Sequence, residues 1–282
     1  MDHAQELRII RRSYAKQIMA RAMIDDPRIE AAFAEVRREN FLGPGPWSII
    51  GWAGDYVLTP SCDPVYLYMD SVVGIRPERN LNSGQPSGHA VWIASAAPNP
   101  GCHVVHVGAG TGYFTAILAH LIGRSGRLTA IEFDPELAAC ARANLSSIPN
   151  TQVIEGDGAA VSFDLADVIY VNAGATRPAD MWLDRLAEGG RLILPLTTDG
   201  FPNAPYGAIF RIERRADVYH ARWVSPVGIF PCEGARDPDS ERALSAAFKR
   251  GGWERVQRLY RADDLAQERC WLRAPGWCLA FS

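Results

Sequence analysis

The chain of 282 residues carries a net charge of −3 at neutral pH, and 48% of its residues are hydrophobic while 22% are charged. This is an ordinary globular composition with enough apolar residues for a sizeable core, and the weak charge excludes a general electrostatic attraction to nucleic acid or anionic membranes. No apolar run is long enough to span a membrane and residues 1–6 lack an apolar signal-peptide centre, so we expect a cytoplasmic location.

The first third of the chain is predicted to contain helices and two loops. Apolar residues at helical spacing predict helices over residues 5–22 and 28–39. Glycine, proline and aromatic residues predict an ordered loop over 43–67, and a second irregular stretch over 76–88 precedes a helix over 89–97.

The middle of the chain alternates strands with helices, which predicts a parallel, doubly wound α/β sheet. The expected strands are 104–107, 128–132, 152–155, 163–171 (with a turn at its start) and 189–196, and the expected helices are 113–122 and 178–187. From residue 207 the pattern becomes β, and strands 208–213 and 218–224 are expected to form a hairpin at the sheet edge.

The last part of the chain is predicted to be a small α+β extension, with a helix over 240–250 and strands over 253–260 and 270–281. The sequence therefore divides into three predicted segments. These are N-terminal helices with covering loops (1–97), a sheet core (98–233) and the extension (234–282).

Cysteine and histidine spacing gives no sign of a metal site. The six cysteines include no C-x-x-C pair, which favours reduced packing residues. His103 and His106 lie three residues apart on a predicted strand and so point to opposite faces.

A glycine-rich turn between a predicted strand and a predicted helix indicates a nucleotide site. Glycines at alternate positions allow a ligand to approach the backbone closely, and Tyr113 stands where a dinucleotide fingerprint has its last glycine. The pattern therefore suits a nucleoside ligand without a pyrophosphate. The residues of the turn that we predict to bind this ligand are Gly108, Ala109, Gly110, Thr111 and Gly112.

Two carboxylates follow the next two predicted strands. Glu132 ends the second strand, about twenty residues after the turn, where a carboxylate can accept hydrogen bonds from ribose hydroxyls. Asp157 follows the third strand beside Gly158, where it can accept a hydrogen bond from an adenine amino group. Together with the turn, these positions predict a nucleoside-binding site.

The glycine turn resembles the first motif of S-adenosylmethionine-dependent methyltransferases, and residues 10–233 resemble the protein-L-isoaspartate O-methyltransferase family. The similar stretches are 26–29, 36–42, 68–70, 83–90, 163–171 and 186–195. The resemblance implies a Rossmann-like, mostly parallel sheet of the seven-stranded type, with S-adenosyl-L-methionine as cofactor. It also implies methyl transfer to a carboxylate of an (iso)aspartyl protein or peptide.

Three features depart from the family pattern. Gly84 stands where the family has a serine, although Ser83 and Ser87 flank it. His106 replaces an acidic residue, and in its place it can act only as a neutral acceptor. Residues 234–282 extend past the usual end of the family and are similar to extensions on relatives that modify ribosomally made peptides.

The loop before residue 90 supplies the predicted polar groups of the reaction site. A carboxylate acceptor is ionised at neutral pH and needs no general base, so positioning dominates catalysis. We predict Ser83, Gln85 and Asp70 near the reacting centre, and we predict that His89 and His106 contact the cofactor. In the alternative interpretation Ser83 and Ser87 only cap the following helix, and Asp70 only orients the loop.

Three functions remain open on the sequence alone. The chain repairs isoaspartate in damaged proteins, or it methylates a carboxylate of one dedicated peptide or small molecule, or it is a non-catalytic methyltransferase-like binding module. Only the missing acid at His106 supports the last of these. The tryptophans of the extension, Trp253, Trp271 and Trp277, either offer a substrate surface or pack the extension onto the sheet.

Overall fold

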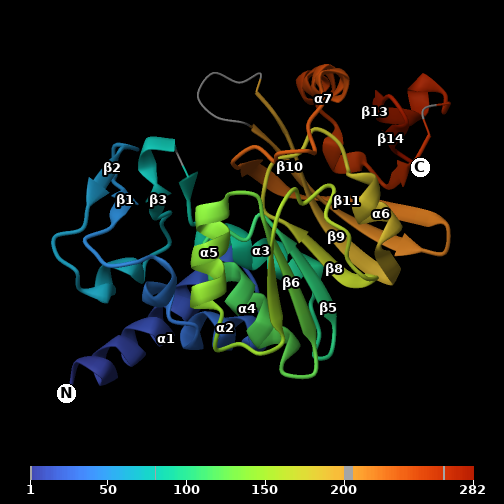
Figure 1. Cartoon of the computed structure of the whole chain (residues 1–282). Helices are drawn as coiled ribbons and strands as arrows, with labels where there is room; N and C mark the ends of the chain where they lie inside the picture. Colours follow the sequence, from blue (N-terminus) through green and yellow to red (C-terminus); the bar gives the residue numbers. More distant parts are fainter. Residues whose placement is uncertain (1, 80, 200–205, 263) are drawn as a thin grey trace.

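A single twisted sheet forms the centre of the computed structural model, which describes residues 2–79, 81–199, 206–262 and 264–282 (Figure 1). Within these residues the sheet has ten strands in the order β13-β14-β12-β11-β10-β9-β8-β5-β6-β7. The strands are β5 (His103–Val107), β6 (Arg127–Glu132), β7 (Thr151–Glu155), β8 (Ala166–Val171), β9 (Leu186–Thr198), β10 (Tyr206–Arg215), β11 (Val218–Gly228), β12 (Arg258–Tyr260), β13 (Cys270–Ala274) and β14 (Trp277–Ala280).

The sheet contains a parallel half and an antiparallel half. Strands β7, β6, β5, β8 and β9 are parallel neighbours, whereas β9 through β13 pair antiparallel. Strands β7, β6, β5, β8, β9, β10 and β11, which are neighbours in this order, confirm the predicted α/β fold with a doubly wound, seven-stranded core. The prediction that the β10–β11 hairpin lies at the edge is wrong, because β12 pairs with β11 through Tyr219 and Leu259 and three extension strands continue the sheet.

Helices flank the sheet, and most of the short elements precede its strands in the chain. The helices are α1 (His3–Ala22), α2 (Pro27–Glu35), α3 (Pro86–Ala96), α4 (Tyr113–Ile122), α5 (Pro135–Asn144), α6 (Asp180–Asp184) and α7 (Pro238–Arg250). The short elements are β1 (Ser48–Ile50), β2 (Tyr56–Leu58), β3 (Gly74–Arg76), β4 (Leu81–Asn82) and the 3₁₀ turns η1 (Arg38–Phe41), η2 (Pro64–Leu67), η3 (Pro77–Arg79), η4 (Trp253–Arg255) and η5 (Gln267–Arg269).

Several predicted boundaries change where contacts distant in sequence take over. The helix predicted for 178–187 stops at Asp184 because Leu186 already pairs with Ala166 in the sheet. The helix predicted for 28–39 ends at Glu35 and gives way to η1. No bounds were predicted for helix α5, although Asp134 caps its first turn.

The two predicted loops and one predicted strand also differ from the structure. Residues 43–67 include β1 and β2, and residues 76–88 include β4, while residue 80 lies outside the described residues. The strand predicted for 253–260 begins as η4 and becomes β12 only at Arg258.

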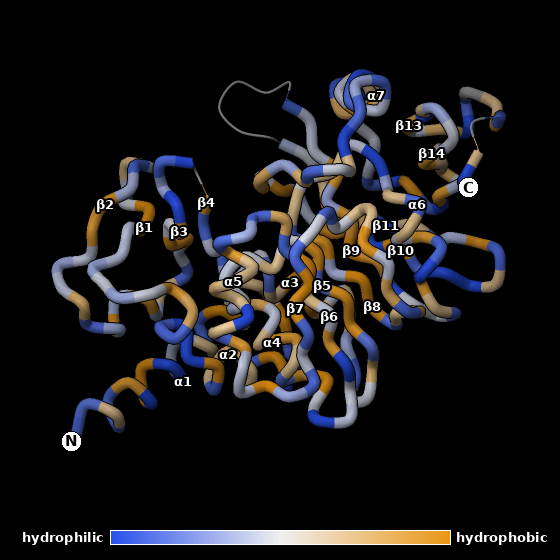
Figure 2. Tube along the Cα trace, in the orientation of Figure 1, coloured by the Kyte–Doolittle hydropathy of each residue, from blue (hydrophilic) through white to orange (hydrophobic). Residues whose placement is uncertain are grey.

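Two hydrophobic clusters, one on each face of the sheet, join the three predicted segments. One contains Tyr14 and Phe33 of the N-terminal helices together with Ile117 of α4, and the other contains Leu194 of β9 together with Trp271 of the extension. Figure 2 shows the apolar residues concentrated along the central strands and the helix faces against them. The boundaries of the three segments stay a prediction.

The tryptophans of the extension serve packing. Trp271 and Trp277 are buried, each only 2% exposed, and Trp271 contacts Phe248 of α7 with ring centroids 5.3 Å apart. Trp253 packs on the same phenylalanine. This arrangement favours the packing interpretation of these residues over a substrate surface.

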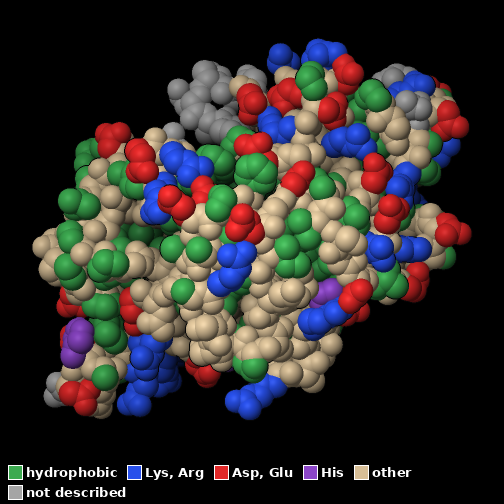
Figure 3. Space-filling model, viewed as in Figure 1, with side chains coloured by type: hydrophobic (Ala, Val, Ile, Leu, Met, Phe, Trp, Pro, Cys, Tyr) green, Lys and Arg blue, Asp and Glu red, His purple; other side chains and the backbone are tan. Residues whose placement is uncertain are grey.

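The visible surface mixes acidic and basic side chains without a large area of one sign (Figure 3). None of the described helices is long and apolar enough to cross a membrane. Among the described residues, no three histidine, cysteine or acidic side chains come together as a possible metal site.

Candidate active site

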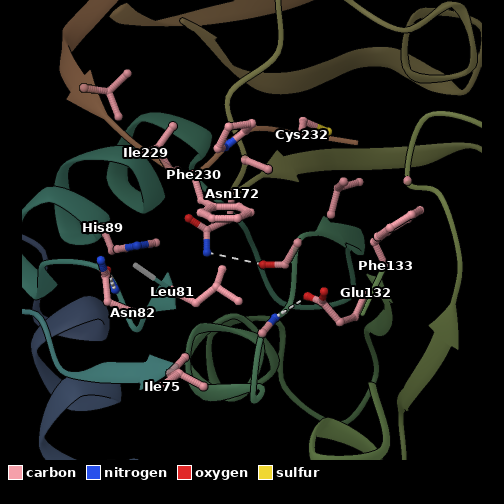
Figure 4. A pocket seen from close by; sticks show the side chains of 18 of the residues that line it. Ile75, Leu81, Asn82, His89, Glu132, Phe133, Asn172, Ile229, Phe230 and Cys232 are labelled. Carbon is pink, nitrogen blue, oxygen red and sulfur yellow. Dashed lines mark hydrogen bonds between the residues drawn. The ribbon is translucent and has the colours of Figure 1, made fainter. Parts of the chain in front are cut away.

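A cavity of about 530 Å³ opens at the carboxyl ends of the parallel strands (Figure 4). It lies where β5 is flanked by β6 on one side and β8 on the other, so that the strand order reverses. Ligands of doubly wound sheets bind at such a switch point. The loop before α3, the glycine turn, the ends of β6 and β8 and the segment 225–233 line the cavity.

The glycine turn lies against this cavity, and its backbone conformation requires glycine. Gly108 and Gly110 have φ values of 76° and 57°, in the left-handed region that disfavours a side chain. A Cβ on Gly108 would also lie 3.0 Å from the backbone oxygen of Asn172. Of the predicted turn residues, Gly108 and Gly110 line the cavity, whereas Ala109, Thr111 and Gly112 are not among its lining residues.

Glu132 connects the turn to the end of β6. One carboxylate oxygen accepts from the backbone amide of Gly110 at 2.7 Å, and the other accepts from the amide of Asp134 at 3.0 Å. Burial raises the pKa of Glu132, and these two amides oppose the increase. A carboxylate oxygen can accept more than one hydrogen bond, so the cavity-facing Glu132 retains capacity for a ribose diol.

Two further cavity residues were not predicted from the sequence patterns. Asn172 follows β8 and donates to the backbone oxygen of Gly108 at 3.3 Å, which joins the β8 end to the glycine turn. Phe133 is 55% exposed and lines the cavity directly after Glu132, where an aromatic ring can stack on a planar ligand. Their position could have identified them, because both residues directly follow a parallel strand.

Only one of the two residues predicted near the adenine lies at the cavity. Gly158 lines the cavity, but Asp157 does not. The carboxylate of Asp157 accepts from the amide of Ala159 at 2.8 Å and lies against Gly234, where any side chain would overlap it. The role of Asp157 toward adenine therefore stays a prediction that this geometry does not favour.

His106 lies behind the cavity wall. Its ring is completely buried, and Nδ1 lies 2.9 Å from the hydroxyl of Thr115 on α4. Burial lowers the pKa of His106 to about 3, so the ring is neutral at physiological pH. His106 is not among the cavity residues, so its predicted contact with the cofactor stays a prediction without geometric support.

Ser83 also turns away from the cavity. Its hydroxyl accepts from the guanidinium of Arg38 at 3.0 Å and from the amide of Val73 at 3.2 Å. Arg38 is fully buried and donates in addition to the backbone oxygens of residues 67, 69 and 71. Ser83 and Arg38 therefore tie the covering loops together, and a catalytic role of Ser83 stays a prediction without geometric support.

Asp70 organises the start of α3. Its carboxylate accepts from the amide of Ser87 at 2.8 Å, from the Ser87 hydroxyl at 2.7 Å and from the Gln85 side chain at 3.1 Å. Arg21 of α1 lies 2.7 Å from the same carboxylate. Because Asp70 satisfies the free amide, α3 begins at Pro86 with Gln85 as the residue before its first turn, and Ser87 is not its cap. This arrangement matches the orienting alternative for Asp70, and only Gln85 reaches the cavity.

His89 lies in the first turn of α3 and lines the cavity. Its ring stacks on Phe114 with centroids 3.4 Å apart, and Nδ1 lies 2.8 Å from the hydroxyl of Tyr170. Burial, and then the neighbouring His106 and Arg38, holds the pKa of His89 well below its usual value. The imidazole is therefore a fixed, neutral group in the wall.

The cavity fits a nucleoside with an amino-acid tail. Its volume falls within the range of about 300–1,000 Å³ that is typical of small-molecule sites. The side-chain-free backbone at Gly108 and Gly110 and the carboxylate of Glu132 provide one polar end. Asn82 and His89 lie at the opposite end, beyond Asn172 (Figure 4), and Gly84 also lines the cavity.

Proteins of known name are similar to this chain over most of its length. The protein-L-isoaspartate O-methyltransferase of Methanothermobacter thermautotrophicus is 30% identical over 229 residues, covering 79% of this chain and 95% of that protein. The enzyme 2 of the same name from Archaeoglobus fulgidus is 39% identical over 175 residues, covering 61% and 79%. The match to the Thermotoga maritima protein of that name, 30% identical over 174 residues and 60% of this chain, spans only 50% of that protein.

Solved structures show the same fold. A protein-L-isoaspartate O-methyltransferase superimposes with a TM-score of 0.66 at 24% identity, covering 84% of this chain and 69% of that one. A putative member from Plasmodium falciparum, solved in complex with S-adenosyl-L-homocysteine, gives a TM-score of 0.62 at 19% identity, covering 79% and 98%.

The match to a family model decides the assignment. Residues 55–220, more than half of the chain, match the model of protein-L-isoaspartate(D-aspartate) O-methyltransferase. This range includes the glycine turn, Glu132 and the loop before α3. The chain therefore belongs to the protein-L-isoaspartate(D-aspartate) O-methyltransferase family of Rossmann-like methyltransferases.

Proposed function

We propose that this protein binds S-adenosyl-L-methionine and methylates a carboxylate of isoaspartyl residues in proteins or peptides, as a step in the repair of damaged proteins. The observation that carries the proposal is the continuous cavity between Glu132 at one end and the His89 loop at the other. Family membership supports the same reaction.

The residues of the cavity have distinct tasks in this proposal. Glu132 and the turn of Gly108 and Gly110 hold the nucleoside, and the loop around Gln85 positions the acceptor. When bound, S-adenosyl-L-methionine supplies a methyl group on a positively charged sulfur, which becomes a neutral thioether as a carboxylate oxygen takes the methyl group. Because the acceptor is already ionised at neutral pH, the protein needs to orient and desolvate it and to move no proton.

A peptide pair tests the substrate. We expect methyl groups from labelled cofactor to enter an isoaspartyl peptide and not its aspartyl twin. Equal labelling of both peptides would contradict the proposed specificity. Binding of S-adenosylhomocysteine without labelling of either peptide would contradict the proposed substrate. It would leave the two other functions, which are methylation of one dedicated peptide or small molecule and binding without catalysis.

Replacing Glu132 tests the cofactor end. Glu132→Ala is expected to weaken S-adenosylhomocysteine binding by about 1–3 kcal/mol, the range for a lost hydrogen bond to a charged group. Calorimetry measures this difference. Glu155→Ala is the matched control, because Glu155 is the register partner of Glu132 on β7 but lies outside the cavity. If both variants bind like the wild type, Glu132 does not hold the ribose.

A further inference from the structure

The space of the missing side chain at residue 84 is filled by His89. Gly84 has a φ of 72°, and a Cβ built on it would lie 2.9 Å from Cδ2 of His89 and closer still to Nε2. Both residues line the cavity. The Nε2 edge of the imidazole therefore stands where a side chain of residue 84 would begin.

The packing around the imidazole opposes its displacement. Phe114 stacks on one face, Trp92 lies against it with centroids 4.8 Å apart, and Tyr170 holds Nδ1. The ring is 1% exposed, so its orientation is fixed by packing on several sides. The Nε2 atom has no hydrogen-bond partner within the described part of the chain.

The contact with Tyr170 also fixes the tautomer of His89. Tyr170 is completely buried, and among the described residues its hydroxyl has no other hydrogen-bond partner. If Nδ1 carried the proton, the buried phenol proton would be left without an acceptor, which is unfavourable. The phenol therefore donates to Nδ1, and the ring proton is on Nε2.

We propose that the Nε2–H group of His89 binds one carboxylate oxygen of the methyl acceptor, and that residue 84 is glycine because this imidazole fills the space of its side chain. The neutral donor keeps its proton throughout, and the second carboxylate oxygen receives the methyl group. This assignment rests on the proposed function for the identity of the acceptor. It makes His89 a contact of the substrate, in place of the cofactor contact predicted from the sequence.

Three variants test the proposed roles of residues 84 and 89. His89→Ala removes the donor, and we expect kcat/KM for the isoaspartyl peptide to fall about 10- to 100-fold, with the affinity for S-adenosylhomocysteine unchanged. Gly84→Ser collides with the imidazole and is expected to lose activity to a similar degree. In the double variant Gly84→Ser/His89→Ala the serine fits and supplies a hydroxyl, so activity is expected to recover by about 10-fold over His89→Ala.

Two controls separate the effect of the serine hydroxyl from the effects of the added Cβ and of backbone strain. Gly84→Ala/His89→Ala has the same Cβ without the hydroxyl and is not expected to recover activity. Gly189→Ser carries the backbone strain alone, since Gly189 is exposed at a φ of 69° with no atom near its Cβ position. Binding of S-adenosylhomocysteine to each variant reports whether it is folded.

A His89→Ala variant as active as the wild type would overturn the proposal, and so would either of two results with the Gly84 variants. One is a Gly84→Ser variant as active as the wild type, and the other is equal activity of the two double variants. The tautomer of His89, read from the NMR shifts of its ring nitrogens in the wild-type protein, gives a test independent of substrate. A proton on Nδ1 would refute the assignment, whereas a wild type with an Nε2 proton that methylates no isoaspartyl peptide would refute only the proposed function.

Discussion

Gly110→Val is expected to abolish binding of S-adenosylhomocysteine, with an affinity loss of about 100-fold or more, equivalent to about 2.8 kcal/mol. Gly110 lines the cavity at a φ of 57°, and its amide donates to Glu132 at 2.7 Å. A branched side chain would be strained in this conformation and would occupy ligand space. Calorimetric titration of the purified variant measures the loss.

The strain of the substitution must be separated from the blocked site. Gly189→Val is the matched control, because Gly189 has a similar φ of 69° but lies exposed on β9 outside the cavity. Both variants are expected to lose about 1–2 kcal/mol of stability from left-handed strain. Only the variant at residue 110 should lose the ligand, and normal binding by a folded Gly110→Val protein would show that the turn does not hold the nucleoside.

Arg38→Met is expected to lower the free energy of unfolding by about 3–5 kcal/mol. The guanidinium is fully buried and donates to three backbone oxygens between Leu67 and Ser71, at 2.8–3.2 Å, and to the Ser83 hydroxyl at 3.0 Å. Without it, these acceptors remain buried with fewer donors or none. Urea denaturation of the variant and the wild type measures the difference.

The neighbouring arginine provides the comparison. Arg37 is exposed, so Arg37→Met is expected to change stability by less than about 0.5 kcal/mol. Arg38→Lys is expected to fall between the other two, because a single ammonium group cannot reach all four acceptors. If Arg38→Met is as stable as Arg37→Met, the covering loops do not depend on this side chain.

Short-range sequence patterns are enough to predict the central βαβ unit. The strand, glycine turn and α4 helix lie where the sequence predicts them, because apolar period and glycine position are local properties. Glu132 faces the ligand cavity for the same reason, since it ends a strand parallel to β5 and in register with it. Local periodicity does not determine strand order, so the hairpin β10–β11 was wrongly predicted at the edge.

The sequence by itself determined the fold class, the family and the place of the glycine turn and Glu132 at the ends of the parallel strands. Only the tertiary structure decided which side chains of the loop before α3 reach the cavity. Ser83 is drawn away by Arg38, 45 positions earlier in the chain, and His89 is fixed by Tyr170, 81 positions later. Such contacts depend on how distant elements pack, and that packing leaves no room for a side chain at Gly84.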